Sequence, residues 1–258
     1  MDSILIEIKN GVAGITLNRP EKMNAFNRQM ALLLQKILDD CAAANNVRTV
    51  YLTGSGKAFS AGQDLSEMAG DNAPDFNKIL SEHYNPIVTK IRNMEKPVVC
   101  AVNGVAAGAG ANIALCCDIV VATQSSSFIQ AFSKIGLIPD SGGTFILPRL
   151  IGWQKASALM MLGDKVSAAD AEKYGMLYKV FHDDAFVAES MKIAATLATM
   201  PTKALAFTKQ ALNASLNNSF EKQLEAEDTL QFAAANTYDY KEGVKSFLEK
   251  RSPVFKGE

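Results

Sequence analysis

Three glycine-rich turns are the segments of this 258-residue chain whose composition best suits chemistry. They cover residues 60–65, 103–110 and 138–143, and each leads into a segment with helical spacing. The first turn of a helix carries backbone N–H groups without partners and the positive end of the helix dipole. Two such N–H groups that converge on one point form an oxyanion hole, and small residues let a ligand approach the backbone. The competing interpretation is that all three are only tight connections between strands and helices.

Asp140 lies in the third turn and is open to two interpretations. Because it precedes Ser141-Gly142-Gly143 and an apolar helical stretch, it could cap that helix. Because a carboxylate beside an oxyanion hole can move protons, it could equally be a general base. The neighbouring residues alone do not decide between these roles.

Composition and motif spacing exclude several other classes of function. The chain has 26 Lys and Arg against 27 Asp and Glu, so its formal net charge of -1 argues against nucleic-acid binding through bulk charge. Two histidines and four cysteines show neither metal-ligand spacing nor a disulfide framework. Residues 51–58 lack the first glycine and the final hydroxyl of a phosphate-binding loop. Position 113 is Ile where a dinucleotide fingerprint needs glycine.

An uncharged run at residues 98–117 is long enough to span a bilayer. Ala and Gly dominate it, however, and Asn103-Gly104 is a turn signal inside it. The N-terminal residues do not follow the pattern of a signal peptide. We therefore expect a buried strand, a turn and a buried helix in this run, and a cytoplasmic protein.

The elements that must position the three turns alternate between strand and helix patterns. Residues 4–9 and 12–17, joined by Asn10-Gly11, predict a hairpin. Further strands are predicted at 47–53, 98–102 and 119–122, and helices at 30–44 and 110–117. Short glycine-rich connections between such elements are typical of an α/β fold with much parallel pairing. After about residue 200 the pattern is helical only, with helices expected around 205–216 and over 220–234.

Ordered motifs along nearly the whole chain resemble those of the crotonase, or enoyl-CoA hydratase/isomerase, superfamily. The similar segments are residues 17–20 (LNRP), 24–26 (NAF), 57–65 (KAFSAGQDL), 96–98 (KPV), 101–104 (AVNG), 117–118 (CD), 138–144 (IPDSGGT), 247–251 (FLEKR) and 253–256 (PVFK). The resemblance implies a crotonase-like spiral of repeated ββα units over residues 1–195. It also implies a helical C-terminal trimerisation region over residues 196–258, with a homotrimer or a hexamer made of two trimers. The implied substrate is a coenzyme A thioester, with no separate cofactor and no metal.

The same resemblance assigns the chemistry of the turns. The oxyanion donors are expected to be the backbone N–H groups of Gln63 and Ala109. Hydratases of the family use two glutamates to position and activate water, but these positions hold Asn112 and Phe132, neither of which exchanges a proton at neutral pH. Asp140 occupies the position of the lone catalytic aspartate of some isomerases. We expect apolar neighbours to bury it and to raise its pKa. Those expected neighbours are Phe132, Ile135, Leu137 and Ile138.

Contacts with the substrate also follow from the resemblance. The expected contact residues are Lys22, Met23, Asn24, Ala25, Ala61, Asp64 and Leu65 along the nucleotide and pantetheine, and Asn112 and Phe132 in the acyl pocket. Phe255 and Lys256 are expected to reach the 3′-phosphate of a coenzyme A bound to a neighbouring subunit. Lys57 and Arg19 are further basic candidates, although exposed cations are commonly plain surface.

Three segments narrow the resemblance within the family. Residues 84–86 (YNP), 106–111 (AAGAGA) and 131–140 (AFSKIGLIPD) are most similar to the ring-1,2-epoxyphenylacetyl-CoA isomerases of aerobic phenylacetate breakdown. This similarity implies conversion of the ring epoxide into a seven-membered oxepin thioester, with hydratase activity weak or absent. Two alternatives stay open: a Δ3,Δ2-enoyl-CoA isomerase of fatty-acid breakdown, and a non-catalytic acyl-CoA-binding partner of a hydratase.

Overall fold

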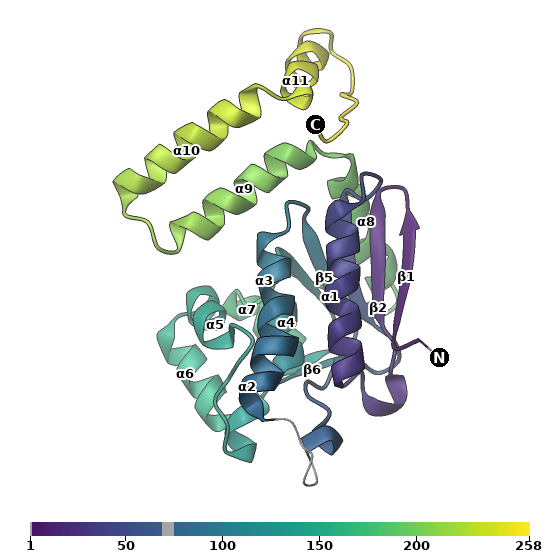
Figure 1. Cartoon of the computed structure of the whole chain (residues 1–258), viewed down its shortest axis with the longest axis vertical. Helices are drawn as coiled ribbons and strands as arrows, with labels where there is room; N and C mark the ends of the chain where they lie inside the picture. The colour runs from purple at the N-terminus through teal and green to yellow at the C-terminus, as the bar shows by residue number, and fades with distance from the viewer. Residues whose placement is uncertain (1, 69–74) are drawn as a thin grey trace.

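The computed structural model describes residues 2–68 and 75–258, and two sheets organise them (Figure 1). The larger sheet has six strands in the order β1-β2-β3-β5-β7-β10. All its neighbours pair in parallel except β1 and β2, which form the predicted hairpin. The strand bounds are β1 Ile4–Lys9, β2 Val12–Leu17, β3 Thr49–Gly54, β5 Val98–Val102, β7 Ile119–Thr123 and β10 Lys179–Phe181.

The smaller sheet has four strands in the order β4-β6-β8-β9. They are β4 Ala58–Ser60, β6 Val105–Ala107, β8 Ser127–Ile129 and β9 Lys165–Ser167, and only the β8–β9 pair is antiparallel. The chain alternates between the sheets, because β3, β5 and β7 enter the larger sheet and each is followed by a strand of the smaller one. This alternation confirms the predicted spiral of ββα units.

Successive side chains of a strand point to opposite faces of the sheet. The strands of the larger sheet carry apolar side chains on both faces, and helices cover both of them. On β3, Val50 and Leu52 belong to the main core together with apolar residues of α1, whereas Tyr51 packs against α8 on the other face. The helices of this part are α1 Arg28–Ala43, α2 Phe76–Lys78, α3 Asn85–Asn93, α4 Ala109–Leu115, α5 Gly143–Ile151, α6 Trp153–Leu162, α7 Ala168–Tyr174 and α8 Phe186–Thr199. Shorter helical turns cover Pro20–Lys22, Leu65–Met68, Ile79–Tyr84 and Ala131–Ile135.

The last three helices extend away from the sheets (Figure 1). They are α9 Thr202–Ser215, α10 Phe220–Ala235 and α11 Tyr238–Leu248. A buried ion pair, Lys209 Nζ to Asp118 at 2.8 Å, fastens α9 to the core. The predicted division at residue 195 falls within α8, and Ala198 of that helix still packs on the sheet. By packing, therefore, α8 belongs with the core, and the helical extension begins at α9.

The uncharged run of residues 98–117 becomes β5, β6 and α4, as expected. All five residues of β5 and all seven of α4 are buried in the core. Among residues 2–68 and 75–258, no helix combines the length and the apolar character that crossing a membrane requires.

Candidate active site

Two of the three glycine-rich turns lie against each other in the structure. The first follows β4 and the second follows β6, and these strands are parallel neighbours, so their carboxyl ends share one edge of the sheet. Gly62 has φ +89°, and a Cβ on it would lie 2.9 Å from the carbonyl oxygen of Ala107 and 3.3 Å from the backbone nitrogen of Ala109. Only glycine allows this approach without displacing the neighbouring backbone.

The backbone N–H groups of Gln63 and Ala109 differ from the N–H groups around them in having no protein acceptor in the described part of the chain. On either side of Gln63, Phe26 N donates to Gly62 O at 2.7 Å and Asp64 N donates to Phe26 O at 2.8 Å. Within the described part of the chain, the N–H groups of Gln63 and Ala109 themselves donate to no protein acceptor. Ala109 opens α4, where the helix dipole adds positive potential. Two free donors on adjacent turns are the parts of an oxyanion hole.

Asp140 is tied to the same helix that supplies the second donor. The side-chain amide of Asn112, on α4, donates to the carbonyl oxygen of Asp140 at 2.8 Å. A Cβ on Gly143 would lie 2.3 Å from that amide nitrogen, so glycine is required beside it. The helix α5 begins at Gly143 with Gly142 as its N-cap, so the possibility that Asp140 caps this helix is wrong.

The surroundings of Asp140 raise its pKa, as predicted, but not through all the expected neighbours. Burial is the main cause, and the hydroxyl of Ser141, which donates to Asp140 Oδ1 at 2.7 Å, opposes it. Phe132 is buried, whereas Ile135 and Ile138 are 53% and 80% exposed. The expected contribution of these two isoleucines to burying Asp140 is therefore wrong within this chain. Ile135 ends the helical turn Ala131–Ile135, and Ile138 lies in the segment that leads from this turn to Asp140.

Asn112 and Phe132, which stand where the resemblance places the glutamates of hydratases, make contacts within the protein. Asn112 is fully buried, and besides its bond to Asp140 it accepts a hydrogen bond from Gln130 Nε2 at 2.8 Å. Its amide is thus occupied by protein partners rather than presented to a substrate. Phe132 packs beside Gly108, with its ring 3.8 Å from where a Cβ on that glycine would lie. Neither residue offers a group that exchanges protons with water.

Tyr84 is a residue of the site to which the sequence assigned no role. It is 1% exposed, and its hydroxyl donates to Gln63 Oε1 at 2.7 Å. Burial and then the nearby carboxyl of Asp140 hold its pKa well above the usual tyrosine value, so it stays a donor. It ends the helical turn Ile79–Tyr84, which comes after the first glycine-rich turn in the chain. Its place in the YNP motif was the only sequence signal for it.

The expected coenzyme A contacts divide into exposed residues and supporting ones. Ala61 N donates to Met23 O at 2.9 Å, so the segment Lys22–Ala25 borders the first turn. Lys22, Met23, Ala61 and Leu65 are exposed and open to a ligand. Asn24 is fully buried, and its amide donates to Ser55 O at 2.8 Å and Ala58 O at 2.7 Å. Asn24 and the neighbouring buried Ala25 therefore shape the loop from within.

Asp64 and Arg19 also support the loop rather than face a ligand. They form an ion pair at 2.9 Å, with Asp64 8% exposed. The hydroxyl of Ser66 and then the Arg19 guanidinium hold the pKa of Asp64 below its usual range. Lys57 is exposed and has no protein anion beside it among the described residues.

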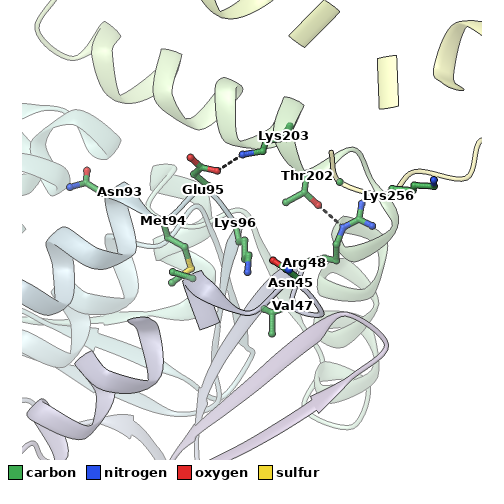
Figure 2. Close-up of a pocket in the computed structure, with 12 residues that line it drawn as sticks. Asn45, Val47, Arg48, Asn93, Met94, Glu95, Lys96, Thr202, Lys203 and Lys256 are labelled. Carbon is green, nitrogen blue, oxygen red and sulfur yellow. Dashed lines mark hydrogen bonds and ion pairs between the residues drawn. The ribbon is translucent and has the colours of Figure 1, made fainter. Parts of the chain in front are cut away.

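Phe255 and Lys256 lie far from these turns in the same chain. Lys256, with Arg48, Lys96 and Lys203, lines a cavity of about 410 Å³ (Figure 2). This cavity is formed by the segments that precede β3 and β5 and by the start of α9, whereas the turns that carry Gln63 and Ala109 follow strands. Figure 1 places the C-terminus and α9 near one end of the core and β6 near the other. Contact of Lys256 with a neighbouring subunit's ligand stays a prediction.

The cations of that cavity already have protein partners. Arg48 donates from Nε to Thr202 Oγ1 at 2.5 Å, a bond drawn in Figure 2, and from a terminal nitrogen to Phe255 O at 3.1 Å. Lys203 pairs with Glu95 at 2.8 Å, and Lys256 Nζ lies 4.3 Å from the centre of the Tyr238 ring. The contacts of Arg48 and Lys203 at this cavity therefore link α9 and the C-terminal segment to the core.

Comparisons with known proteins agree along the whole chain. The family profile described as enoyl-CoA hydratase/isomerase matches residues 7–258. The chain is 45% identical to the 1,2-epoxyphenylacetyl-CoA isomerase of Escherichia coli K12, over 100% of this chain and 99% of that protein. It is 43% identical to a probable enoyl-CoA hydratase of Rhodobacter capsulatus, over 99% of this chain and 98% of that protein. The solved enoyl-CoA hydratase of Bacillus anthracis has a TM-score of 0.93 at 32% identity, covering 100% of both chains.

The matched range includes all three glycine-rich turns as well as α9 to α11. The structural likeness extends over the same whole chain, so the helical extension is shared and not an addition to the fold. An acyl-CoA is the substrate expected for such an enzyme. The chain belongs to the enoyl-CoA hydratase/isomerase, or crotonase, family.

Proposed function

We propose that this enzyme is an acyl-CoA isomerase that converts 2-(1,2-epoxy-1,2-dihydrophenyl)acetyl-CoA into the oxepin-CoA isomer in phenylacetate catabolism. The observation that carries the proposal is one carboxyl group suited to act as a base, Asp140, linked through Asn112 to the helix that supplies an oxyanion donor. The two hydratase glutamates are replaced by Asn112 and Phe132. One base and two donors suffice for isomerisation.

The two aspartates near the turns have opposite environments, which supports giving the proton transfer to Asp140. Asp64 has a lowered pKa, because Ser66 and Arg19 stabilise its charge. Asp140 has a raised pKa, because burial disfavours its charge. A carboxylate with a raised pKa is the stronger base and can also return the proton. Asp64 suits a structural role and Asp140 a chemical one.

The proposed reaction moves one proton and consumes no second substrate. With the thioester oxygen between the N–H groups of Gln63 and Ala109, Asp140 takes a proton from the carbon next to the thioester carbonyl. The C–H electron pair shifts toward the carbonyl and forms an enolate, which the two N–H groups stabilise. Asp140 then returns the proton to a carbon of the ring, as the carbon–carbon bond of the epoxide opens to give the seven-membered ring.

The relatives support isomerisation without fixing the substrate. The 45% identical protein is named for the epoxide isomerase, and a 36% identical one is a trans-2-decenoyl-[acyl-carrier-protein] isomerase of Streptococcus mutans. Others are named hydratases. The same enolate chemistry serves a Δ3,Δ2-enoyl-CoA isomerase of fatty-acid breakdown, which is the second candidate. A non-catalytic acyl-CoA-binding partner of a hydratase is the third.

The proposal includes a cytoplasmic homotrimer or a dimer of trimers. Large apolar side chains on the C-terminal helices are solvent-exposed in a single chain: Leu212 at 62%, Phe232 at 73% and Phe247 at 82%. Large apolar side chains that stay exposed on several helices of a single chain favour burial in an assembly. Light scattering on the purified protein measures the assembly, and a stable monomer would contradict it.

Turnover of three substrates separates the candidates. We expect the wild-type protein to isomerise the aromatic epoxide thioester, to isomerise a linear 3-enoyl-CoA less well, and to hydrate crotonyl-CoA weakly or not at all. Asp140→Asn should abolish both isomerisations while leaving binding of a saturated acyl-CoA intact. Strong hydration of crotonyl-CoA would refute the interpretation of Asn112 and Phe132. Full isomerase turnover by Asp140→Asn would refute the single-base mechanism, and acyl-CoA binding without any turnover would favour the non-catalytic role.

A further inference from the structure

Ser141 has a backbone conformation that its residue type disfavours. Its φ is +52°, in the left-handed region that glycine adopts at least cost, and the next residue, Gly142, has φ +77°. A serine in this conformation costs free energy that glycine would avoid. Ser141 is 2% exposed, so contact with solvent does not explain why a hydroxyl side chain occupies this position.

Among residues 2–68 and 75–258, the hydroxyl of Ser141 has one hydrogen-bond partner, and that partner is the proposed base. Ser141 Oγ donates to Asp140 Oδ1 at 2.7 Å, the usual distance of an O–H···O hydrogen bond. Within the described residues, no other side chain donates to the Asp140 carboxylate. The strained residue therefore acts on the group to which the chemistry is assigned.

The turn itself is held from two other sides. The thiol of Cys116 donates to Ser141 O at 3.5 Å, and Gly143 N donates to Asp140 O at 2.8 Å. Together with the Asn112 amide on Asp140 O, these contacts fix the backbone on both sides of the Asp140 carboxyl. A fixed backbone leaves the side-chain torsions of Asp140 as its remaining freedom, and the hydroxyl bond restricts them.

We propose that Ser141 is a positioning residue for proton transfer: its hydroxyl holds one carboxylate oxygen of Asp140, Oδ1, so that the other, Oδ2, is the oxygen that takes and returns the proton. This inference rests on the proposed function. During transfer the substrate C–H bond breaks and an O–H bond forms at Oδ2, while the Ser141 bond to Oδ1 is kept. The single base thus presents one defined oxygen to both carbon positions between which the proton moves.

Removing the hydroxyl without adding strain tests the proposal. Ser141→Gly suits the left-handed backbone and deletes only the side chain. We expect kcat for isomerisation to fall by about ten- to a hundredfold, with KM little changed, because orientation is lost while binding surfaces remain. The acid limb of the kcat profile should move to higher pH, because the carboxylate loses a hydrogen-bond donor that stabilises its charge.

Two further variants separate positioning from folding. Ser141→Ala also removes the hydroxyl but keeps the backbone strain, so it should match Ser141→Gly in kcat and be less stable. Asn10→Gly relieves a left-handed residue, φ +50°, in the distant hairpin and should leave kcat unchanged. Wild-type kcat and an unmoved acid limb in Ser141→Gly would overturn the proposal.

A measurement without turnover keeps this inference distinct from the proposed function. In a ¹³C NMR titration of the Asp140 carboxyl, Ser141→Gly should show a higher pKa than the wild type, whatever substrate the enzyme uses. If wild-type protein isomerises neither substrate, the proposed function fails while the titration still decides whether Ser141 governs this carboxylate. An unchanged carboxyl titration would overturn the role of Ser141.

Discussion

Gly62→Ala offers the sharpest test of the oxyanion hole, because the structure predicts where the added methyl group collides. Its Cβ would lie 2.9 Å from Ala107 O and 3.3 Å from Ala109 N, and the residue has φ +89°. The methyl group would push the first turn away from the second by a few tenths of an ångström and crowd the Ala109 N–H. That N–H is one of the two proposed donors to the thioester oxygen.

Gly62→Ala should lower both the stability of the protein and its kcat. An L-residue in the left-handed region costs roughly 1–2 kcal/mol of folding free energy, and the collision adds about 1 kcal/mol or more. Misplacing one oxyanion donor lowers kcat by about a hundred- to a thousandfold. The free energy of unfolding and kcat should therefore both fall. The fall in kcat should exceed what the larger unfolded fraction of the variant accounts for.

A second glycine supplies the matched control. Gly175 has φ +81°, and a Cβ on it would meet only Leu150 O at 3.5 Å, an ordinary contact. Gly175→Ala should lose the same roughly 1–2 kcal/mol of stability and keep its kcat. Urea unfolding and steady-state isomerisation are measured on both variants at a temperature where both are folded. Equal kcat values for the two would refute the assignment of the oxyanion hole to these turns.

Three further predictions concern polar groups that are buried or half-buried. Asp140→Asn should raise the free energy of unfolding at pH 7. The pKa of Asp140 is higher in the folded than in the unfolded protein, so the wild type loses stability as the pH rises from the unfolded pKa to the folded pKa, whereas the uncharged asparagine does not. Urea unfolding measures the gain, which should vanish below about pH 4, where the aspartate is protonated in both states. Tyr84→Phe deletes the donor to Gln63 Oε1 and should lower kcat about tenfold with little change in the far-ultraviolet circular dichroism; an unchanged kcat would show that Gln63 needs no anchor. Lys209→Met breaks the buried pair with Asp118 and should cost about 3 kcal/mol in urea unfolding, whereas a loss below about 1 kcal/mol would mean that the pair is already solvated.

The parts of the fold that follow from local pattern were predictable, and the parts that depend on distant contacts were not. The strands Ile4–Lys9, Val12–Leu17 and Val98–Val102 have the predicted bounds, because alternation and apolar runs determine them directly. Helix α4 begins one residue earlier than predicted, at Ala109. Small residues carry little periodic signal, so the start of such a helix is set by its packing.

The roles assigned to Gln63, Ala109 and Asp140 stay predictions, but the structure shows where these residues lie. The turns that carry Gln63 and Ala109 lie against each other, and Asp140 is bonded to α4 through Asn112. The contacts that hold these residues join positions far apart in the chain. Tyr84 meets Gln63 across 21 positions, and Asn112 meets Asp140 across 28. No spacing rule relates such pairs. The expectation that Ile135 and Ile138 help to bury Asp140 is wrong for the same reason. An apolar residue type does not determine whether a side chain faces the core or the solvent.

Position 112 bears on the choice between hydration and the proposed isomerisation in this chain. A glutamate there could activate water, but it could not donate to the Asp140 carbonyl as the Asn112 amide does at 2.8 Å. It would also place a second negative charge beside Asp140 and would raise the cost of ionising the base. Hydrogen bonds therefore link Gln130 to Asn112 and Asn112 to Asp140, and Ser141 donates to the carboxylate of Asp140. Through Asn112, helix α4 supports this one aspartate. If Asp140 is the base, as proposed, then the absence of a glutamate at position 112 and the support of Asp140 are two aspects of one hydrogen-bond network.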